Sequence, residues 1–215
     1  MHPYTNYFTV SISYQVKEKQ ILHDVSFKVN QGDFLTLVGP SGSGKSTILK
    51  LAANLISPTA GDIFYQDKKM VEYNPIQYRR EVSYCFQQPS LFGKTVRENL
   101  IFPYEIRKQA IVEKRIDELL KLVDLSADFL NKDINSLSGG EKQRVALIRN
   151  IIFLPKVLLL DEVTTGLDDG SKEIVHQLIK RVHEQGTTII RVTHDQSEIQ
   201  TAGHIMQIKQ GRIIK

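Results

Sequence analysis

The sequence lacks a second cysteine, and it lacks an apolar run long enough to cross a membrane. Cys85 is the single cysteine of the 215-residue chain, so no internal disulfide can form, which favours a reducing compartment and argues against secretion. The longest mostly apolar stretch, residues 145–160, is interrupted by charged residues, Asn150 and Pro155, and it falls short of the ~20 apolar residues that a membrane span needs. Residues 1–10 show no basic start followed by an apolar run, so we expect neither a signal peptide nor an anchor.

The composition also lacks the marks of disorder. Hydrophobic residues make up 41% of the chain and charged residues 24%, which is close to the average for folded proteins, and no internal repeat or low-complexity segment is visible. The net charge of +4 is compatible with an anionic partner such as a nucleotide, a nucleic acid or a lipid surface. A solvated surface explains so mild an excess better, and we expect no nucleic-acid partner.

Short apolar strands alternate with amphipathic helices along most of the chain. Strands are predicted at residues 25–29, 34–38, 62–66, 82–86, 157–160 and 187–192, and helices at residues 45–55, around 112–123, 141–153 and 171–185. Turns at Gln31-Gly32-Asp33 and Gln210-Gly211 each predict a hairpin. The alternation predicts an α/β fold with a mainly parallel central sheet, and we expect an N-terminal antiparallel β region. We expect a core of residues 1–87 and 155–215, with a helical subdomain inserted at about residues 88–154.

One stretch matches the phosphate-loop pattern G-x-x-x-x-G-K-[ST] without a departure, between a predicted strand and a predicted helix. It comprises Gly39, Pro40, Ser41, Gly42, Ser43, Gly44, Lys45 and Ser46. The glycines let backbone N–H groups converge on a triphosphate, Lys45 reaches the outer phosphates, Ser46 ligates Mg²⁺ and Thr47 supports the loop. A glycine turn that merely caps a helix is the alternative, and the strand-loop-helix context disfavours it.

Two carboxylates follow a buried strand, at the point where open α/β sheets build ligand sites. Asp161 is predicted to hold Mg²⁺ through its water shell, and Glu162 to orient and deprotonate the water that attacks the γ-phosphate. The alternative is an acidic strand end that caps the next element. Together with the phosphate loop, the pair predicts a nucleoside triphosphatase.

The octet Leu137-Ser138-Gly139-Gly140-Glu141-Lys142-Gln143-Arg144 resembles the signature motif of ATP-binding cassette (ABC) ATPases. Nearly the whole chain follows the order of motifs in that family, which implies a P-loop ATPase of ABC type that uses ATP and Mg²⁺. Ser138 and the amides of Gly139 and Gly140 at a helix start form a second phosphate-facing nest. One nucleotide needs only one cradle, so two copies of the chain are expected to pack head to tail around ATP. An ordinary helix N-cap is the other interpretation of this tripeptide.

Further roles are implied by the resemblance alone. Gln87 resembles the family's glutamine that contacts Mg²⁺ and the attacking water, with Gln88 as its register-shifted rival. His194 resembles the switch histidine that contacts the γ-phosphate and works with Glu162. Tyr14 lies where the family stacks an aromatic ring on adenine, although a core tyrosine is the alternative at this position.

The loop after the catalytic carboxylates departs from the family pattern. Asp168 resembles the aspartate that connects the two sites across the dimer. The family usually has proline after the glutamate and Ser-Ala before Leu-Asp, whereas this chain has Val163 and Thr165-Gly166. Because glycine is conformationally permissive, Gly166 is expected to loosen this loop and the coupling between sites.

Two segments, residues 83–107 and 140–160, resemble the ATPase subunits of bacterial FetAB-type metal (iron) exporters, a subfamily shape that extends to plant aluminium-tolerance transporters. The resemblance implies a cytoplasmic subunit, peripheral on the inner face of the cell membrane, that powers a separate integral membrane permease. Iron or another metal ion is the implied cargo. The apolar residues Leu100, Ile101, Phe102 and Tyr104 are the candidate groove for the permease, with core packing as the alternative.

A different class of function stays open at this point. A non-transport ABC ATPase would act on nucleic acid, ribosomes or a protein assembly, but such proteins usually carry tandem cassettes or a coiled-coil insertion, and this chain has neither. A P-loop kinase is a third reading, and the signature octet disfavours it.

Overall fold

The computed structural model of the chain describes residues 6–214. Met1–Thr5 lie outside the described residues. They form half of the stretch 1–10, in which we expect neither a signal peptide nor an anchor. The chain divides into two compact units: the first comprises Met1–Tyr84, Lys156–Glu162 and Gly186–Lys215, and the second Cys85–Pro155 and Val163–Gln185. None of the helices within residues 6–214 is both long and apolar enough to span a membrane.

An antiparallel sheet opens the first unit. It has the strand order β2-β1-β4-β5 and contains β1 (Asn6–Val16), β2 (Lys19–Asn30), β4 (Ala60–Tyr65) and β5 (Lys68–Lys69). β1 pairs antiparallel with both β2 and β4, and its alternate residues Phe8, Val10 and Ile12 are buried. This period of two is what a strand with one face on the core requires, and it confirms the predicted antiparallel region.

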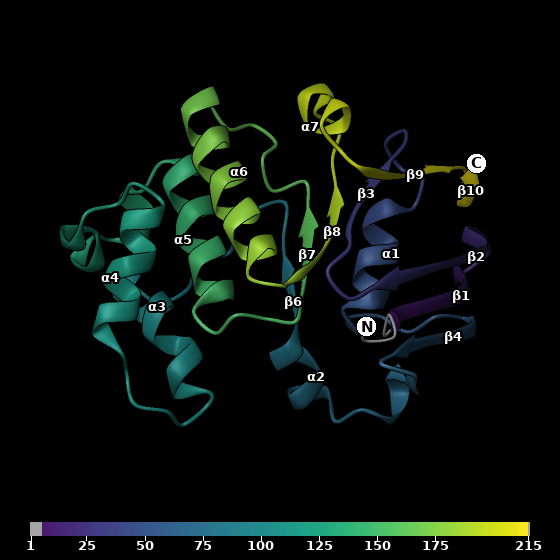
Figure 1. The fold of residues 1–215 in the computed structure, drawn as a ribbon, viewed down its shortest axis with the longest axis horizontal. Helices are drawn as coiled ribbons and strands as arrows, with labels where there is room; N and C mark the ends of the chain where they lie inside the picture. The colour runs from purple at the N-terminus through teal and green to yellow at the C-terminus, as the bar shows by residue number, and fades with distance from the viewer. Residues whose placement is uncertain (1–5, 215) are drawn as a thin grey trace. The chain divides into compact units, whose positions relative to one another are not determined.

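The second sheet of this unit is mainly parallel and contains six strands in the order β10-β9-β3-β8-β7-β6. Their bounds are β3 (Phe34–Val38), β6 (Val82–Cys85), β7 (Val157–Asp161), β8 (Thr188–Val192), β9 (His204–Lys209) and β10 (Arg212–Ile214). β3 pairs parallel with β8 and β9, and β7 pairs parallel with β8. Every residue of β7 and β8 is buried, and helix α1 (Lys45–Ala52) packs on these two strands (Figure 1).

The hairpin predicted at Gln31-Gly32-Asp33 is wrong. The turn itself forms, because the Asp33 N–H donates to the Asn30 carbonyl at 3.2 Å, but β2 and β3 belong to different sheets. β3 is a mostly apolar strand, and such strands are typical of parallel sheets that are buried on both faces. It therefore pairs with β8 and β9 and not with β2. The second predicted hairpin is confirmed: β9 and β10 pair antiparallel around Gln210-Gly211, whose φ angles of 49° and 73° are both positive, as in a type I′ turn.

Short helical elements complete the first unit. They are η1 (Met70–Glu72), α2 (Pro75–Glu81) and α7 (Gln196–Gln200). Asn74 caps α2 by accepting from two backbone N–H groups, with Pro75 at the first helical position.

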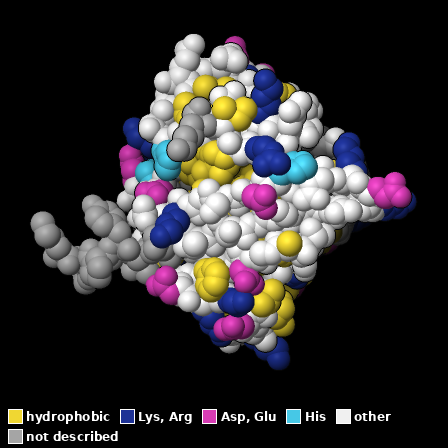
Figure 2. Space-filling model, turned by 90° about the vertical axis from the view of Figure 1, so that its right-hand side faces the viewer, with side chains coloured by type: hydrophobic (Ala, Val, Ile, Leu, Met, Phe, Trp, Pro, Cys, Tyr) yellow, Lys and Arg dark blue, Asp and Glu magenta, His cyan; other side chains and the backbone are white. Residues whose placement is uncertain are grey.

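On the face shown in Figure 2, lysine and arginine side chains are interspersed with aspartate and glutamate, so charges of both signs share this face.

The second unit is helical. Its elements are α3 (Val96–Glu105), α4 (Glu113–Leu122), η2 (Ala127–Asn131), η3 (Ile134–Ser136), α5 (Gly139–Ile151) and α6 (Asp169–Glu184). α5 packs against α3, α4 and α6, and α5 and α6 run side by side in Figure 1. Cys85 is buried at the start of this unit, and burial raises the pKa of its thiol to about 12.

The apolar run in α3 is not one exposed surface. Leu100 and Tyr104 are 1% and 2% exposed and belong to the core, whereas Phe102 is 38% exposed. Residues four apart share one helix face, so the run is divided between a buried face and an open one. The expectation that all four residues line a groove is therefore wrong.

Candidate nucleotide-binding and hydrolysis site

The loop between β3 and α1 has a backbone shape that only glycine supports. Gly39, Gly42 and Gly44 have φ angles of 145°, 73° and 103°. A Cβ on Gly39 would lie 1.9 Å from the Ile208 carbonyl oxygen, and one on Gly44 would lie 2.5 Å from Leu22 Cδ2. Backbone conformation therefore favours glycine at all three positions, and close packing adds a second reason at Gly39 and Gly44.

Lys45, the first residue of α1, is held against the loop. Its side-chain Nζ donates to the backbone carbonyls of Gly39 and Pro40, both at 2.9 Å, and the residue is 4% exposed. Burial lowers the pKa of Lys45, while the nearby carboxylates Glu162 and Asp161 act in the opposite direction. The ammonium group is thus fixed within the loop by groups of its own chain.

Ser43 supplies an observation that points to a ligand. Its Oγ is buried and has no hydrogen-bond partner among the described residues. Buried hydroxyls are normally paired. An anion with several acceptor oxygens, in contact with this loop, would satisfy it, so the residues present fit a phosphate chain.

Asp161 ends β7 and joins three elements. Its Oδ1 accepts from Ser46 Oγ at 2.7 Å, and its Oδ2 accepts from the hydroxyl of Tyr84 at 2.6 Å. Ser46 comes from α1 and Tyr84 from β6. A serine hydroxyl beside a buried carboxylate is an oxygen donor set of the kind that Mg²⁺ takes from proteins, with the substrate's phosphates supplying further ligands. Within residues 6–214, no group of three or more His, Cys, Asp or Glu side chains is arranged to hold a metal ion, so the protein ligands at this site are few.

Glu162 and His194 meet at the ends of neighbouring strands. His194 Nε2 lies 2.9 Å from Glu162 Oε1, and the side chains are 41% and 15% exposed. The Glu162 N–H donates to the Val192 carbonyl at 3.1 Å, and Glu162 has a φ of 49°, in the left-handed region. That conformation costs a non-glycine residue roughly 1–2 kcal/mol, so the surrounding contacts hold the carboxylate in this position against local strain.

Tyr14 is half-buried on β1, opposite Leu22 of β2, where the pairing register is irregular. The side chain of Leu22 closely approaches Gly44, so Tyr14 belongs to the strand pair that packs on the phosphate loop. It also packs against the hydrophobic core. Both the functional and the core interpretation of this tyrosine are compatible with its place.

In the second unit, Ser138 is the N-cap of α5 within a capping box. Its Oγ accepts from the Glu141 N–H at 3.2 Å, and the Ser138 N–H donates to Glu141 Oε2 at 2.7 Å. Ser138 and Gly139 are exposed. The helix start predicted for the signature is present, and the capping interpretation describes its local geometry.

Gly140 packs against the loop that carries Asp168. A Cβ on Gly140 would lie 2.6 Å from Ser171 Oγ, so a side chain at this position would displace the Ser171 hydroxyl. Asp168 caps α6: its two carboxylate oxygens accept from the Ser171 N–H at 2.9 Å and the Ser171 hydroxyl at 2.7 Å. These two bonds lower the pKa of Asp168, and Arg144 contributes in the same direction.

The structure brings Lys45, Ser46, Asp161, Glu162 and His194 into one unit, with the contacts given above. Five predicted site residues belong to the other unit, and their approach to the nucleotide stays a prediction: Gln87, Ser138, Gly139, Gly140 and Asp168. Gln87 is exposed in the loop after β6, and Thr47, next to Ser46, is half-buried. Three further loop residues are exposed, namely Pro40, Ser41 and Gly42. Their side chains take no part in the contacts described above. Tyr84 was not predicted as a site residue, because its partner is 77 positions away in the sequence.

Residues 22–165 match the ABC transporter family, and the chain therefore belongs to that family. The predicted α/β fold of ABC ATPase type is confirmed. The chain is an ATP-binding, ATP-hydrolysing subunit of an ABC transporter.

Several relatives share most of their length with this chain. The probable iron export ATP-binding protein FetA of Escherichia coli K12 is 44% identical over 200 residues, which cover 93% of this chain and 89% of that protein. The energy-coupling factor transporter ATP-binding protein EcfA3 of Oenococcus oeni PSU-1 is 36% identical over 222 residues, covering 98% and 77%. Relatives named for iron export and for energy-coupling factor transport thus both lie within the range of this similarity.

Two solved structures have the same fold. The ATP-binding cassette MJ0796, in a dimeric post-hydrolysis state bound to ADP and Pi, superposes with a TM-score of 0.86 at 31% identity, covering 97% of each chain. A bacterial Atm1-family ABC exporter with ATP bound gives a TM-score of 0.87 at 26% identity, covering 99% of this chain and 38% of that one.

Proposed function

We propose that this ATPase drives the export of iron or another metal ion through a separate integral membrane permease. The observation that carries the proposal is the similarity to the iron export protein FetA, which extends over nearly the full length of both chains. The subunit then works as a peripheral protein on the cytoplasmic face of the cell membrane. The expected helical subdomain of about residues 88–154 contains the exposed Phe102, a part of the surface available to a permease.

ATP hydrolysis is assigned to the side chains that meet at the ends of β7 and β8. Glu162 takes the proton of the attacking water, and His194, at 2.9 Å from it, keeps the carboxylate oriented and contacts the γ-phosphate. Lys45 exchanges its two loop carbonyls for phosphate oxygens when ATP binds. Ser46 and Asp161 would hold Mg²⁺, and Gln87 is proposed as a further ligand. Bound Mg²⁺ neutralises charge on the phosphate oxygens.

The active form is proposed to be an ATP-dependent head-to-tail homodimer. The exposed N-terminus of α5, with Ser138 and Gly139, is available to a nucleotide held by a second copy of the chain. The dimeric state of the relative MJ0796 supports this arrangement. Asp168, packed beside Gly140 in the same unit, would then couple the two sites.

The first experiment tests the permease. Tagged Glu162→Gln chain is purified with ATP from detergent-solubilised native membranes, and the copurifying proteins are identified by mass spectrometry. We expect a polytopic membrane protein in stoichiometric yield, because the variant binds ATP without completing turnover. Lys45→Ala, which is expected to bind ATP weakly, is the matched control and should recover less of it. Recovery of ribosomal components or nucleic acid instead would place the protein among the non-transport ABC ATPases.

The second experiment tests the cargo. The chain and its copurified permease are reconstituted in liposomes, and ATP-dependent movement of Fe²⁺ across the bilayer is measured beside Mn²⁺ and Zn²⁺. We expect transport of Fe²⁺ with the parent chain and none with Glu162→Gln. ATP-dependent transport of none of the three ions, in liposomes that still hydrolyse ATP, would contradict a metal cargo while retaining the ATPase.

A further inference from the structure

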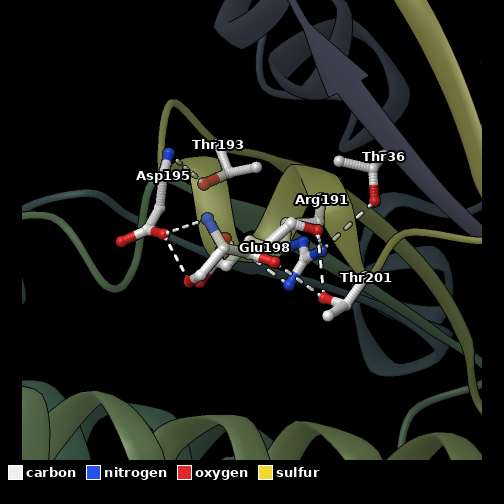
Figure 3. Close-up of polar contacts among 7 residues, drawn as sticks. Thr36, Arg191, Thr193, Asp195, Glu198 and Thr201 are labelled. Atoms are coloured by element: carbon white, nitrogen blue, oxygen red, sulfur yellow. Dashed lines mark hydrogen bonds and ion pairs between the residues drawn. The ribbon is translucent and has the colours of Figure 1, made fainter.

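A buried ion pair ties strand β8 to the short helix α7 (Figure 3). Arg191 on β8 is 8% exposed and Glu198 on α7 is 2% exposed. Arg191 Nη1 lies 3.4 Å from Glu198 Oε2, and Nη2 donates to the Glu198 backbone carbonyl at 3.0 Å. One guanidinium therefore contacts both the side chain and the main chain of α7.

Arg191 is also anchored on its other side. Its Nη2 lies 3.4 Å from Thr36 Oγ1, and its guanidinium lies 5.0 Å from the centre of the Phe34 ring, both on β3. Burial lowers the pKa of Arg191, while Glu198 and then Asp195 oppose that change. The side chain thus connects three elements of the first unit: β3, β8 and α7.

His194 lies in the loop between the two ends of this connection. Only residues 192–197 separate Arg191 from Glu198. Within this loop the Asp195 N–H donates to Thr193 Oγ1 at 3.0 Å, and Asp195 Oδ1 accepts from the Ser197 N–H at 2.9 Å and the Ser197 hydroxyl at 2.6 Å. The loop that carries His194 is therefore held at both ends by the ion pair and braced internally by its own side chains, as Figure 3 shows.

Stability alone does not account for this pair. Replacing a buried ion pair with apolar residues of similar volume is often neutral or stabilising, because two charges must be desolvated. Arg191 Nε has no hydrogen-bond acceptor among the described residues, so the guanidinium is only partly compensated. An apolar pair would serve the core as well, but it would not bond to the α7 backbone.

We infer that Arg191 and Glu198 are positioning residues for ATP hydrolysis, which act by fixing the loop that places His194 against Glu162. The inference rests on the proposed role of His194. Small displacements at a reacting centre reduce rates strongly, and a misplacement of about 1 Å costs up to about a hundredfold. A loosened loop would affect turnover while leaving the phosphate loop intact.

The test replaces both charges together in the full-length chain. The double variant Arg191→Met with Glu198→Met is expected to unfold at or near the parental temperature and to keep its KM for ATP within about twofold, while kcat falls about tenfold. Lys69→Met with Asp62→Asn is the matched control, since it removes an exposed ion pair in the same unit and should leave kcat unchanged. Parental kcat in the Arg191/Glu198 double variant, at parental stability, would overturn the inference.

A second comparison separates positioning from a general effect on the fold. In a His194→Ala background, the same double substitution is expected to change kcat less than twofold, because both changes remove the same contribution. A further tenfold loss in that background would mean that the pair does not act through His194. Arg191→Lys keeps the charge but loses the forked contact, so an intermediate kcat is expected. If the double variant does not fold, parental kcat in a stably folded Arg191→Lys chain overturns the inference.

The His194→Ala chain alone distinguishes a failure of the proposed role of His194 from a failure of the role inferred for Arg191 and Glu198. If it retains parental kcat, the proposed role of His194 fails and the inference fails with it. If it is slow while the pair variant is as fast as the parent, only the inference fails.

Discussion

The proposed hydrolysis residues of the first unit and the signature region of the second differ in how their side chains are bonded. In the first unit, functional side chains are tied to one another: Ser46 to Asp161 at 2.7 Å and Glu162 to His194 at 2.9 Å. In the second unit, Ser138 and Asp168 are exposed. The side chain of each accepts a hydrogen bond from a backbone N–H group and so caps a helix of its own unit. The first arrangement joins the proposed catalytic side chains to one another, whereas the second leaves a capped helix end exposed.

This difference separates two kinds of defect. Substitutions among the paired side chains should change chemistry or metal affinity, even where the dimer forms. Substitutions at the signature should leave nucleotide binding by the single chain intact and remove only what depends on a second copy. The predictions below test that separation, beginning with the largest effect.

Glu162→Gln should lower kcat about 10²- to 10⁴-fold, because it removes the proposed general base while preserving shape. ATP binding should persist, and the variant should accumulate as a dimer with ATP on a sizing column. Glu118→Gln, the same change at an exposed position of α4, is the control and should match the parent. A Glu162→Gln chain that stays monomeric with ATP would count against the head-to-tail dimer.

Ser138→Arg should lower turnover about a hundredfold by blocking the exposed helix end, while the Kd for ATP of the single chain changes less than twofold. Ser126→Arg, at an exposed position of the same unit, is the matched control. Because Ser138 also caps α5, Ser138→Ala measures the loss of the cap alone, about 1 kcal/mol of unfolding free energy. Undiminished turnover in Ser138→Arg would exclude the signature from the active site.

Tyr84→Phe should weaken the affinity for Mn²⁺ in the presence of ATP about tenfold, because it removes a partner that orients the carboxylate of Asp161. Nucleotide binding in the presence of EDTA should not change. Tyr73→Phe removes a hydroxyl that bonds to the Tyr65 carbonyl and is the control. Equal metal affinities in all three chains, measured by electron paramagnetic resonance, would remove Tyr84 from the site.

Gly166→Ala should have the smallest effect. Gly166 has a φ of 77° with open space around its Cα, so alanine meets no clash but adopts a strained conformation that costs roughly 1–2 kcal/mol. Each kcal/mol lowers Tm by about 2–4 °C in a chain of this size. Gly203→Ala, also in open space but without a positive φ, is the control for a thermal melt. An unchanged Tm for Gly166→Ala would mean that the loop adapts without strain.

The local parts of the fold were predictable because their signals are local. The glycine spacing before Lys45 predicts a strand, a loop and a helix, and all three are present. The helix α1 ends at Ala52, whereas the predicted helix extends to residue 55. α2 carried a usable signal in Asn74 followed by Pro75, a cap and a first-turn proline, but the expected strands and helices did not include it. The same is true of β1, despite its alternating apolar residues.

Contacts between distant segments were beyond sequence reasoning. Nothing in the spacing of Tyr84 and Asp161 indicates their hydrogen bond. Likewise, the local sequence does not show that β2 and β3, which are joined by a tight turn, belong to different sheets. The left-handed conformation of Glu162 was equally invisible, because glutamate rarely adopts it. The departure at Gly166, by contrast, has a local cause: its positive φ lies in a turn closed by the Leu167 N–H and the Thr164 carbonyl at 3.3 Å.

The single cysteine gives the chain an internal reporter. A thiol with a pKa raised to about 12 is almost entirely protonated near neutral pH, and full burial also keeps alkylating reagents away from it. Cys85 stands two residues before Gln87, so its labelling rate measures how often this segment opens. Labelling with and without ATP, in the unmodified chain, therefore reads the nucleotide dependence of that opening without any added probe.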